Sequence, residues 1–278
     1  MNNEFIKDED ACLHYRDLAI MRGYGIFDFF KVVNGQAVHL EDHLDRFYFS
    51  AGEMRLPVEK SREEIRQIVS IIINENPTGN YGIRLTLTGG YSNDGYSIAR
   101  PNLIISLHHF QQPSVTEFTR GIRLFTYPYQ RQLPSIKTID YLMAIWLQPR
   151  LKEIGADEIL YSNEGFITEC PRANFFIVNN RNQLVTPSDH ILKGITRKKI
   201  IDLASPYMEV IERKIGKEEL SSATEAFICS TTKSILPVNQ IDEVILPSHR
   251  PVAEKLAGLL KRSEPPPQQS KLSGMLYE

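Results

Sequence analysis

The sequence predicts an α/β protein of the α+β type, in which two groups of strands are each accompanied by helices. In the first group, which ends near residue 108, strands are followed by two helices and then by further strands. The second group begins near residue 121 and contains strands and helices in turn. The length of 278 residues is sufficient for one large domain or two medium ones.

The first half begins with a hairpin. Residues 22–33 are predicted to form a glycine-containing turn followed by a strand rich in aromatic and β-branched residues. Asn34-Gly35 is a preferred hairpin turn, and residues 37–40 are predicted to form the second strand of the hairpin. Apolar residues at helical spacing predict a helix over 41–54. A second helix begins at Ser61, where Glu64 completes a capping box. Residues 82–88 and 102–108 have the pattern of strands, and a glycine-rich loop joins them.

The second half follows a linker-like segment, Gln111-Gln112-Pro113-Ser114. Its predicted strands are 122–126, 156–161, 174–179 and 226–230, and its predicted helices are 141–154, 196–203, 217–223 and 252–262. Gly155 is a suitable residue to end the first of these helices. We therefore expect an N-terminal domain over 1–112, a linker over 113–121, a C-terminal domain over 122–262 and a mobile tail over 263–278.

Composition and charge exclude several classes of function. The hydrophobic and charged fractions, 42% and 24%, are those of an ordinary globular protein. A net charge of -2 with interspersed signs leaves no basic patch for nucleic acid or for a membrane surface. The N-terminus has no signal-peptide pattern, and no apolar stretch has transmembrane length. Three scattered cysteines without a CxxC motif indicate neither a zinc site nor a disulfide framework, so we expect a reduced, cytoplasmic protein.

Lys137 lies in an unusually apolar segment, PSIKTIDYL. It is flanked by Ile136 and Ile139, with Tyr141 close behind, which suggests that the side chain points inward. Burial disfavours the ammonium form and lowers the pKa of a lysine, and a neutral amine can attack a carbonyl group. We therefore hypothesise that Lys137 forms a Schiff base. The alternative is a strand-end lysine whose aliphatic stem covers apolar surface while its charge remains in water.

Six separated segments together resemble the fold-type IV pyridoxal-phosphate enzymes, which include branched-chain and D-amino-acid aminotransferases and aminodeoxychorismate lyases. In the family's order, the segments are RGYGIFD, HLDRFYFSA, SIKTIDYL, GFITECPRANFFIV, LVTPSDHILKGITR and FICSTTKSILPV. The resemblance implies a smaller N-terminal α+β domain and a larger, barrel-like C-terminal α/β domain. It also implies pyridoxal 5'-phosphate in the cleft between them and a homodimer that completes the pocket.

The resemblance assigns the reacting end of the site to three residues. Lys137 matches the family's Schiff-base lysine, which also carries the proton between the substrate α-carbon and the cofactor. Glu169 matches the acid that pairs with the pyridine nitrogen and favours the protonated ring. Tyr141 matches the hydrogen-bond partner of the ring oxygen. From the local sequence alone, the alternative for Glu169 is a surface residue of a hairpin, and the alternative for Tyr141 is an amphipathic core tyrosine.

The phosphate end is assigned in the same way. Arg46 matches the family's phosphate arginine, whose fork of N–H donors suits a phosphate, although its spacing from Asp42 also suits a helical ion pair. Ile195 and Thr196 begin a helix, where free backbone N–H groups bind anions. Thr231 and Thr232 offer hydroxyl and amide donors, although such a cluster is also common in ordinary turns.

The sequence departs from the family pattern around the substrate. The small, hydroxylated segment expected after Glu169 is replaced by CPRA, so that Arg172 either meets a substrate carboxylate or faces solvent. Phe29 stands where glycine or valine is common, and with Phe27 it narrows the pocket. Tyr24 stands where aspartate is typical. Arg84 resembles the arginine of branched-chain enzymes.

The predicted function is transamination of a branched-chain or aliphatic amino acid with a 2-oxo acid as acceptor. The glycine-rich loop YSNDGY resembles that of the lyases and lacks the arginine and histidine with which D-amino-acid enzymes bind a carboxylate. We therefore keep two alternatives: a 4-amino-4-deoxychorismate lyase that releases pyruvate, and a protein that binds pyridoxal phosphate without turnover. A fold relic that binds nothing is the remaining possibility. Neither nucleic acid nor a membrane is an expected partner.

Overall fold

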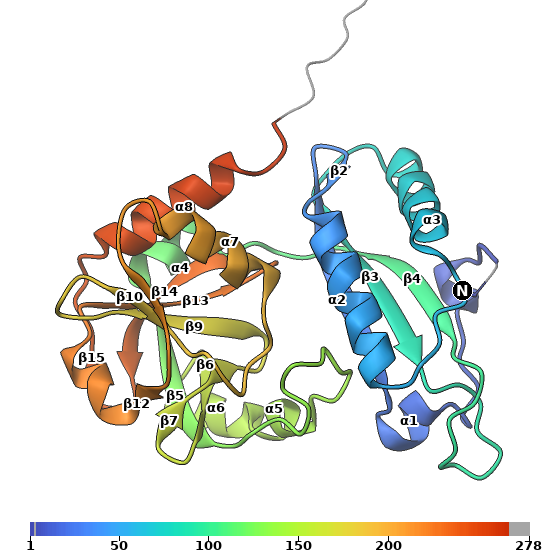
Figure 1. Ribbon diagram of the computed structural model, residues 1–278, viewed down its shortest axis with the longest axis horizontal. Coiled ribbons are helices and arrows are strands. Elements are labelled where there is room, and N and C mark those ends of the chain that lie inside the picture. Colours follow the sequence, from blue (N-terminus) through green and yellow to red (C-terminus); the bar gives the residue numbers. More distant parts are fainter. Residues whose placement is uncertain (3, 267–278) are drawn as a thin grey trace, which may run out of the picture.

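The computed structural model describes residues 1–2 and 4–266, and most of the tail predicted over 263–278 lies outside that range. The chain forms two side-by-side groups of strands and helices, blue to teal and green to red in Figure 1. This mixed arrangement confirms the predicted fold class. No helix in the described part of the chain has the length and apolarity that a membrane crossing requires.

The N-terminal group is a four-stranded antiparallel sheet with two helices on one face. Its strands are β1 (Gly25–Val33), β2 (Gln36–Ala37), β3 (Tyr81–Thr88) and β4 (Leu103–His108), in the order β2-β1-β3-β4. The helices α2 (Leu40–Glu53) and α3 (Arg62–Glu75) contribute Phe47 and Ile65 to a core that contains Phe30 of β1. Burial of each such side chain stabilises the fold by about 1.5–3 kcal/mol.

Alternation along β1 separates core residues from cavity residues. Ile26, Phe30 and Val32 belong to the core under the helices, whereas Phe27 and Phe29 line a cavity on the opposite face. The same strand therefore stabilises the N-terminal half with one face and contributes to the candidate site with the other.

The C-terminal group is built on an eleven-stranded mixed sheet. Its main path has the order β11-β10-β9-β13-β14-β5-β6-β7-β12, with β8 beside β9 and β15 beside β14. In chain order the strands are β5 (Ile122–Pro128), β6 (Glu158–Asn163), β7 (Phe166–Ile167), β8 (Glu169–Cys170), β9 (Ala173–Val178), β10 (Leu184–Thr186), β11 (Val210–Glu212), β12 (Ile215–Gly216), β13 (Glu225–Ser230), β14 (Ser234–Ile241) and β15 (Val244–Ile245). Val185 of β10 and Ile215 of β12, near opposite ends of the path, belong to one buried cluster. The sheet therefore curls around its core into a barrel-like shape.

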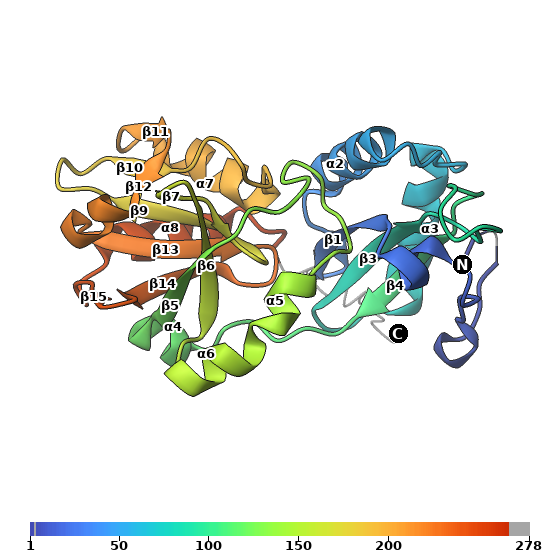
Figure 2. The same ribbon diagram turned by 90° about the horizontal axis from the view of Figure 1, so that it is seen from below.

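Helices cover the outside of this sheet. The helices α4 (Val115–Arg120), α7 (Ile195–Ala204) and α8 (Pro251–Arg262) contribute Phe118, Ile200 and Leu256 to one cluster. The helices α5 (Leu142–Trp146) and α6 (Gln148–Ile154) lie on the side away from α7 in Figure 2. The remaining short elements are η1 (Asp8–Asp10), α1 (Leu18–Arg22) and the 3₁₀ helix η2 (Lys217–Ser222).

Several predicted elements differ in detail. The helix expected over 141–154 is two helices that meet at Leu147, because Pro149 in the first turn of α6 cannot donate a backbone hydrogen bond. The return strand expected over 37–40 ends at Ala37, since His39 has a left-handed backbone and α2 begins directly after it. The expected linker contains α4, which begins with a capping box of Ser114 and Glu117.

The segment that carries Lys137 joins the two halves. The Phe27 N–H donates to the Lys137 carbonyl over 2.9 Å, and the Ile139 N–H donates to the Gly25 carbonyl over 3.1 Å. Ile136 packs into the N-terminal core. Although it lies in the second half of the sequence, this segment therefore pairs with the edge of the N-terminal sheet.

Candidate active site

A cavity of about 450 Å³ receives residues from both halves of the chain. All twelve predicted site residues line it. They are Phe27, Phe29, Arg46, Arg84, Lys137, Tyr141, Glu169, Arg172, Ile195, Thr196, Thr231 and Thr232. The structure thus brings together residues from seven separate stretches of the sequence, while their chemical roles remain predictions.

Lys137 faces the cavity from the segment paired with β1. Its Nζ lies 4.5 Å from the centre of the Phe27 ring. Burial, assisted by the positive charge of Arg46, lowers the pKa of Lys137 to about 7 against the opposing effect of Asp28. A large share of this side chain is therefore neutral near pH 7, as a nucleophilic amine requires. The geometry favours the inward lysine over one whose charge remains in water.

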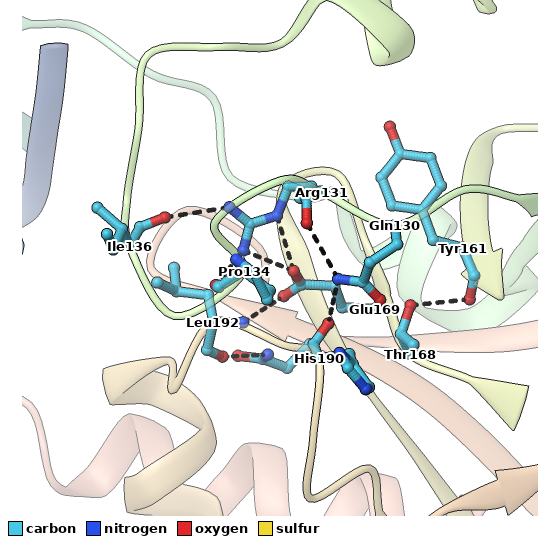
Figure 3. Close-up of polar contacts among 10 residues, drawn as sticks. Gln130, Arg131, Pro134, Ile136, Tyr161, Thr168, Glu169, His190 and Leu192 are labelled. Carbon is cyan, nitrogen blue, oxygen red and sulfur yellow. Dashed lines mark hydrogen bonds and ion pairs between the residues drawn. The ribbon is translucent and has the colours of Figure 1, made fainter. Parts of the chain in front are cut away.

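Glu169 lines the same cavity and is 4% exposed, so the alternative of a surface glutamate is wrong. Its Oε1 accepts hydrogen bonds from Nε and Nη2 of Arg131 over 2.8 and 2.7 Å (Figure 3). Its Oε2 accepts from the Leu192 N–H over 2.9 Å. Burial raises the pKa of Glu169, whereas the Arg131 charge and the donated hydrogen bonds oppose that rise.

Arg131 is a site residue that sequence reasoning missed. Besides Glu169, its guanidinium donates to the carbonyls of Pro134 and Ile136, which lie on the loop leading to Lys137 (Figure 3). One side chain thus fixes both the carboxylate and the approach to the lysine. An isolated arginine in the polar segment YQRQLP gave no local signal of this role, because its partners are set by the tertiary fold.

Arg46 is held by Asp28, and its proposed helical pairing with Asp42 is wrong. Nε and Nη2 of Arg46 donate to the two carboxylate oxygens of Asp28, both over 2.8 Å. Asp42 instead pairs with Lys198 and Lys199. Although burial alone would raise it, Arg46 and His43 hold the pKa of Asp28 well below its usual range. Within the described residues Arg46 Nη1 has no hydrogen-bond acceptor, and it is available to an anion in the cavity.

The N-terminus of α7 provides a second set of anion donors. Gly194 precedes the helix and has no side chain that could cap it. The first backbone N–H groups, at Ile195 and Thr196, therefore receive no hydrogen bond from an N-cap side chain. A side chain at Gly194 would meet Asn174 Oδ1 at 2.1 Å, and Asn174 Nδ2 donates to the Leu192 carbonyl over 2.7 Å. Asn174 thus holds the turn that presents the helix end.

Arg84 and Arg172 occupy different electrostatic settings. The Arg84 guanidinium lies 4.0 Å from the centre of the Phe27 ring and, among the described residues, has no carboxylate within ion-pair distance. Arg172 pairs with Glu158 at 3.6 Å, and its side chain is 66% exposed. Arg84 is therefore the better candidate to bind a substrate carboxylate.

Aromatic residues complete the substrate side. The Tyr141 ring lies 6.0 Å from the Phe27 ring, and burial raises the pKa of Tyr141. His108, His109 and Phe110, at the end of β4 and the start of the connection to the second half, also line the cavity and were not predicted. Tyr24 is not among the lining residues, and its hydroxyl donates to the Met54 carbonyl over 2.7 Å.

Comparison with known proteins places this arrangement in a family. The family model described as amino-transferase class IV matches residues 25–241. A putative branched-chain-amino-acid aminotransferase of Methanocaldococcus jannaschii is 31% identical over 254 residues, which are 87% of this chain and 87% of that protein. A D-alanine aminotransferase of Listeria monocytogenes is 28% identical over 252 residues, or 88% and 87% of the two chains.

A solved structure shows the same fold over almost the whole chain. The crystal structure of a putative 4-amino-4-deoxychorismate lyase from Legionella pneumophila superposes with a TM-score of 0.84 at 27% identity, covering 93% of this chain and 98% of that one. The family match spans most of the two sheets and every predicted site segment except the first residues of RGYGIFD. The chain therefore belongs to the class IV aminotransferase family.

Proposed function

We propose that this protein transfers the amino group of a branched-chain or aliphatic amino acid to a 2-oxo acid, with pyridoxal 5'-phosphate as cofactor. The observation that carries the proposal is the meeting of three groups in one cavity: a lysine of lowered pKa, a buried carboxylate, and an arginine with no acidic partner among the described residues. The branched-chain aminotransferase relative supports the substrate class.

The residues of the cavity fit this cofactor. Arg46 Nη1, the start of α7 and the hydroxyls of Thr231 and Thr232 would hold its phosphate. The Glu169 carboxylate would accept a hydrogen bond from the protonated ring nitrogen. When bound, pyridoxal phosphate supplies an aldehyde that condenses with primary amines and a ring that accepts electrons from the substrate α-carbon.

The protein's own groups would then carry the proton transfers and the positioning. The Lys137 amine would take a proton from the substrate α-carbon and pass it to the cofactor, and its lowered pKa permits both transfers near pH 7. Arg84 binds the substrate carboxylate through charge-assisted hydrogen bonds. Phe27 and Phe29 pack against the substrate side chain and exclude water from the reacting centre.

The lyase is the second candidate, and the similarity to the putative lyase of Legionella supports it. It requires the same lysine, which would protonate the product after pyruvate leaves. A D-amino-acid specificity, which the D-alanine aminotransferase relative would suggest, lacks support from the glycine-rich loop. No described residue of 89–100 lines the cavity, and Arg100 pairs with Glu59 on the surface at 2.6 Å.

We further propose a homodimer in a reduced, cytoplasmic setting. Leu142, Ile145 and Trp146 of α5 are 75%, 61% and 65% exposed, although α5 follows Tyr141 of the cavity directly. Exposed apolar patches of this kind mark interaction surfaces. The thiols of Cys170 and Cys229 are free and buried, which is compatible with a reducing compartment.

The function is tested by spectra of the reconstituted protein mixed with single L- and D-amino acids, followed by analysis of the released 2-oxo acid. An aminotransferase loses its cofactor absorbance with L-leucine and releases the matching 2-oxo acid. A lyase releases pyruvate from aminodeoxychorismate without any acceptor. A protein that binds the cofactor without turnover keeps its absorbance with every amino acid.

A further inference from the structure

On the cavity side of the N-terminal sheet, residues of β1 lie beside residues of β3. In the antiparallel register, Phe27 of β1 pairs with Thr86 of β3, and Phe29 pairs with Arg84. Cross-strand partners lie on the same face of a sheet, and diagonal neighbours on that face are also within reach. Gly82, two residues from Arg84 along β3, is therefore a diagonal neighbour of Phe29.

Gly82 provides the space in which the Phe29 ring lies. A Cβ atom built on Gly82 would be 1.9 Å from Cζ of Phe29, 2.4 Å from Cε2 and 2.7 Å from Cε1. Such contacts are too short for any real side chain. The φ angle of Gly82 is not positive, so the backbone itself does not require glycine here. What the site requires is the absence of a side chain.

Phe29 and Arg84 are direct partners across the strands, yet their side chains lean in opposite directions. The Phe29 ring lies over Gly82 and meets Phe110 at 5.9 Å with an interplanar angle of 82°. The Arg84 guanidinium lies over the Phe27 ring, and its Nε donates to Thr86 over 3.1 Å. Because the Phe29 ring lies over Gly82, it points away from the Arg84 guanidinium.

We propose that Gly82 is a specificity-determining residue, which keeps the pocket open for an aliphatic side chain and leaves Arg84 free for the substrate carboxylate. It acts through the direction of the Phe29 ring. This inference rests on the proposed aminotransferase function, since that function assigns a substrate to this end of the cavity. The ligand is an α-amino acid whose side chain is of leucine size.

The variant Gly82→Ala tests the inference in the holoenzyme. The new methyl group displaces the Phe29 ring towards Arg84 and into the cavity. The KM for leucine should rise about tenfold or more relative to the KM for alanine, because misfits of about one methylene discriminate by that amount. Turnover of alanine should stay within about threefold of the parent value, since the reacting groups are untouched.

Two further variants distinguish an effect of Gly82 on the Phe29 ring from a general loss of structure. In a Phe29→Ala background the ring is absent, so adding Gly82→Ala should change the leucine-to-alanine ratio by less than about twofold, as expected of a coupled pair. Gly52→Ala is the matched control, because a Cβ there meets no atom within 4 Å. It should leave the ratio unchanged.

Binding of non-reacting acids gives a readout independent of turnover. By calorimetry, Gly82→Ala should weaken 4-methylpentanoate at least fivefold more than propanoate, in keeping with the same steric misfit. Loss of selectivity in Gly82→Ala that disappears in the Phe29→Ala background supports the proposal. Equal losses for large and small ligands, or an undiminished effect of Gly82→Ala without the ring, would overturn it. If the parent protein transaminated no amino acid, the proposed function would fail while the binding comparison still tested Gly82.

Discussion

Arg131 and Glu169 form a forked ion pair in which Nε and Nη2 of the arginine lie 2.8 and 2.7 Å from the same carboxylate oxygen. The pair is almost closed to solvent, with side chains 16% and 5% exposed. Both residues line the cavity that contains Lys137, and Arg131 also holds the loop that leads to that lysine. Arg131 therefore positions the acid that would face the cofactor ring, and its charge favours the ionised form of that acid.

Replacing Arg131 should shift the pH dependence of the reaction. Burial raises the pKa of Glu169 and the Arg131 charge opposes that rise, so removal of Arg131 should raise the pKa of Glu169 further. The ionised carboxylate is the active form, and activity is lost as the pH falls through this pKa. The acidic limb of kcat/KM in Arg131→Gln should thus move to higher pH, while Arg131→Lys, which keeps the charge, should move it less. An acidic limb at the parent position in Arg131→Gln would contradict this account.

Asp28 should stabilise the fold as well as orient Arg46. Replacement by asparagine leaves the Arg46 guanidinium, which is 11% exposed, without its counter-charge. Removal of one partner from a buried pair typically destabilises a protein by about 3–5 kcal/mol. Urea unfolding of the cofactor-free Asp28→Asn variant should show a loss of this order.

Asp42→Asn provides the control for Asp28. It removes pairs with Lys198 and Lys199 that are closer to solvent and should cost less than about 1 kcal/mol. Because the folded-state pKa of Asp28 lies below the unfolded value of 3.8, its contribution is present above that value and is lost only as the pH falls below it. Equal losses in the two variants at pH 7 would argue against a special role of Asp28.

Arg84 and Arg172 should differ sharply in their effect on substrate binding. Truncating one member of a desolvated charge pair costs about 2–5 kcal/mol, so Arg84→Gln should raise the KM for leucine about 30-fold or more. Arg172→Gln should raise it less than about threefold, because that side chain is exposed and already pairs with Glu158. Steady-state kinetics of both variants test the assignment, which a larger effect at Arg172 would reverse.

Lys137 should react as an amine at a lower pH than other lysines. Its pKa is lowered to about 7 from the ordinary 10.5, chiefly by burial. Labelling of the cofactor-free protein with acetic anhydride, read by peptide mass spectrometry, should therefore show a midpoint near pH 7 at Lys137. A midpoint near 10 would show that the ammonium form persists in the cavity. A denatured sample labelled in parallel provides the ordinary lysine response.

Parts of the site could be predicted from the sequence where the residues next to a site residue indicate its role. The segment around Lys137, the capping box at Ser61 and the strand containing Phe27 each combine a local pattern with a motif, and the structure places these elements as expected. The α+β class followed from the order of periodic segments, because periodicity reports which face of an element is buried.

The remaining features depend on contacts between distant segments. Arg131 meets Glu169 across 38 residues, and the Lys137 segment pairs with β1 more than 100 residues away. The pairing of Arg46 with Asp28 rather than Asp42 follows from β1 packing against α2, which no helical spacing could indicate. The helix α4 had a capping box but only six residues, too few to show a period.

The proposed role of Lys137 in amino-group transfer can be tested in a single half-reaction. The reconstituted protein is mixed with excess L-leucine without any 2-oxo acid, and both the cofactor absorbance and the released 4-methyl-2-oxopentanoate are followed. We predict loss of the absorbance and about one equivalent of the 2-oxo acid per site, with no detectable release by Lys137→Ala. Release by Lys137→Ala at a rate comparable with the parent protein would contradict the account.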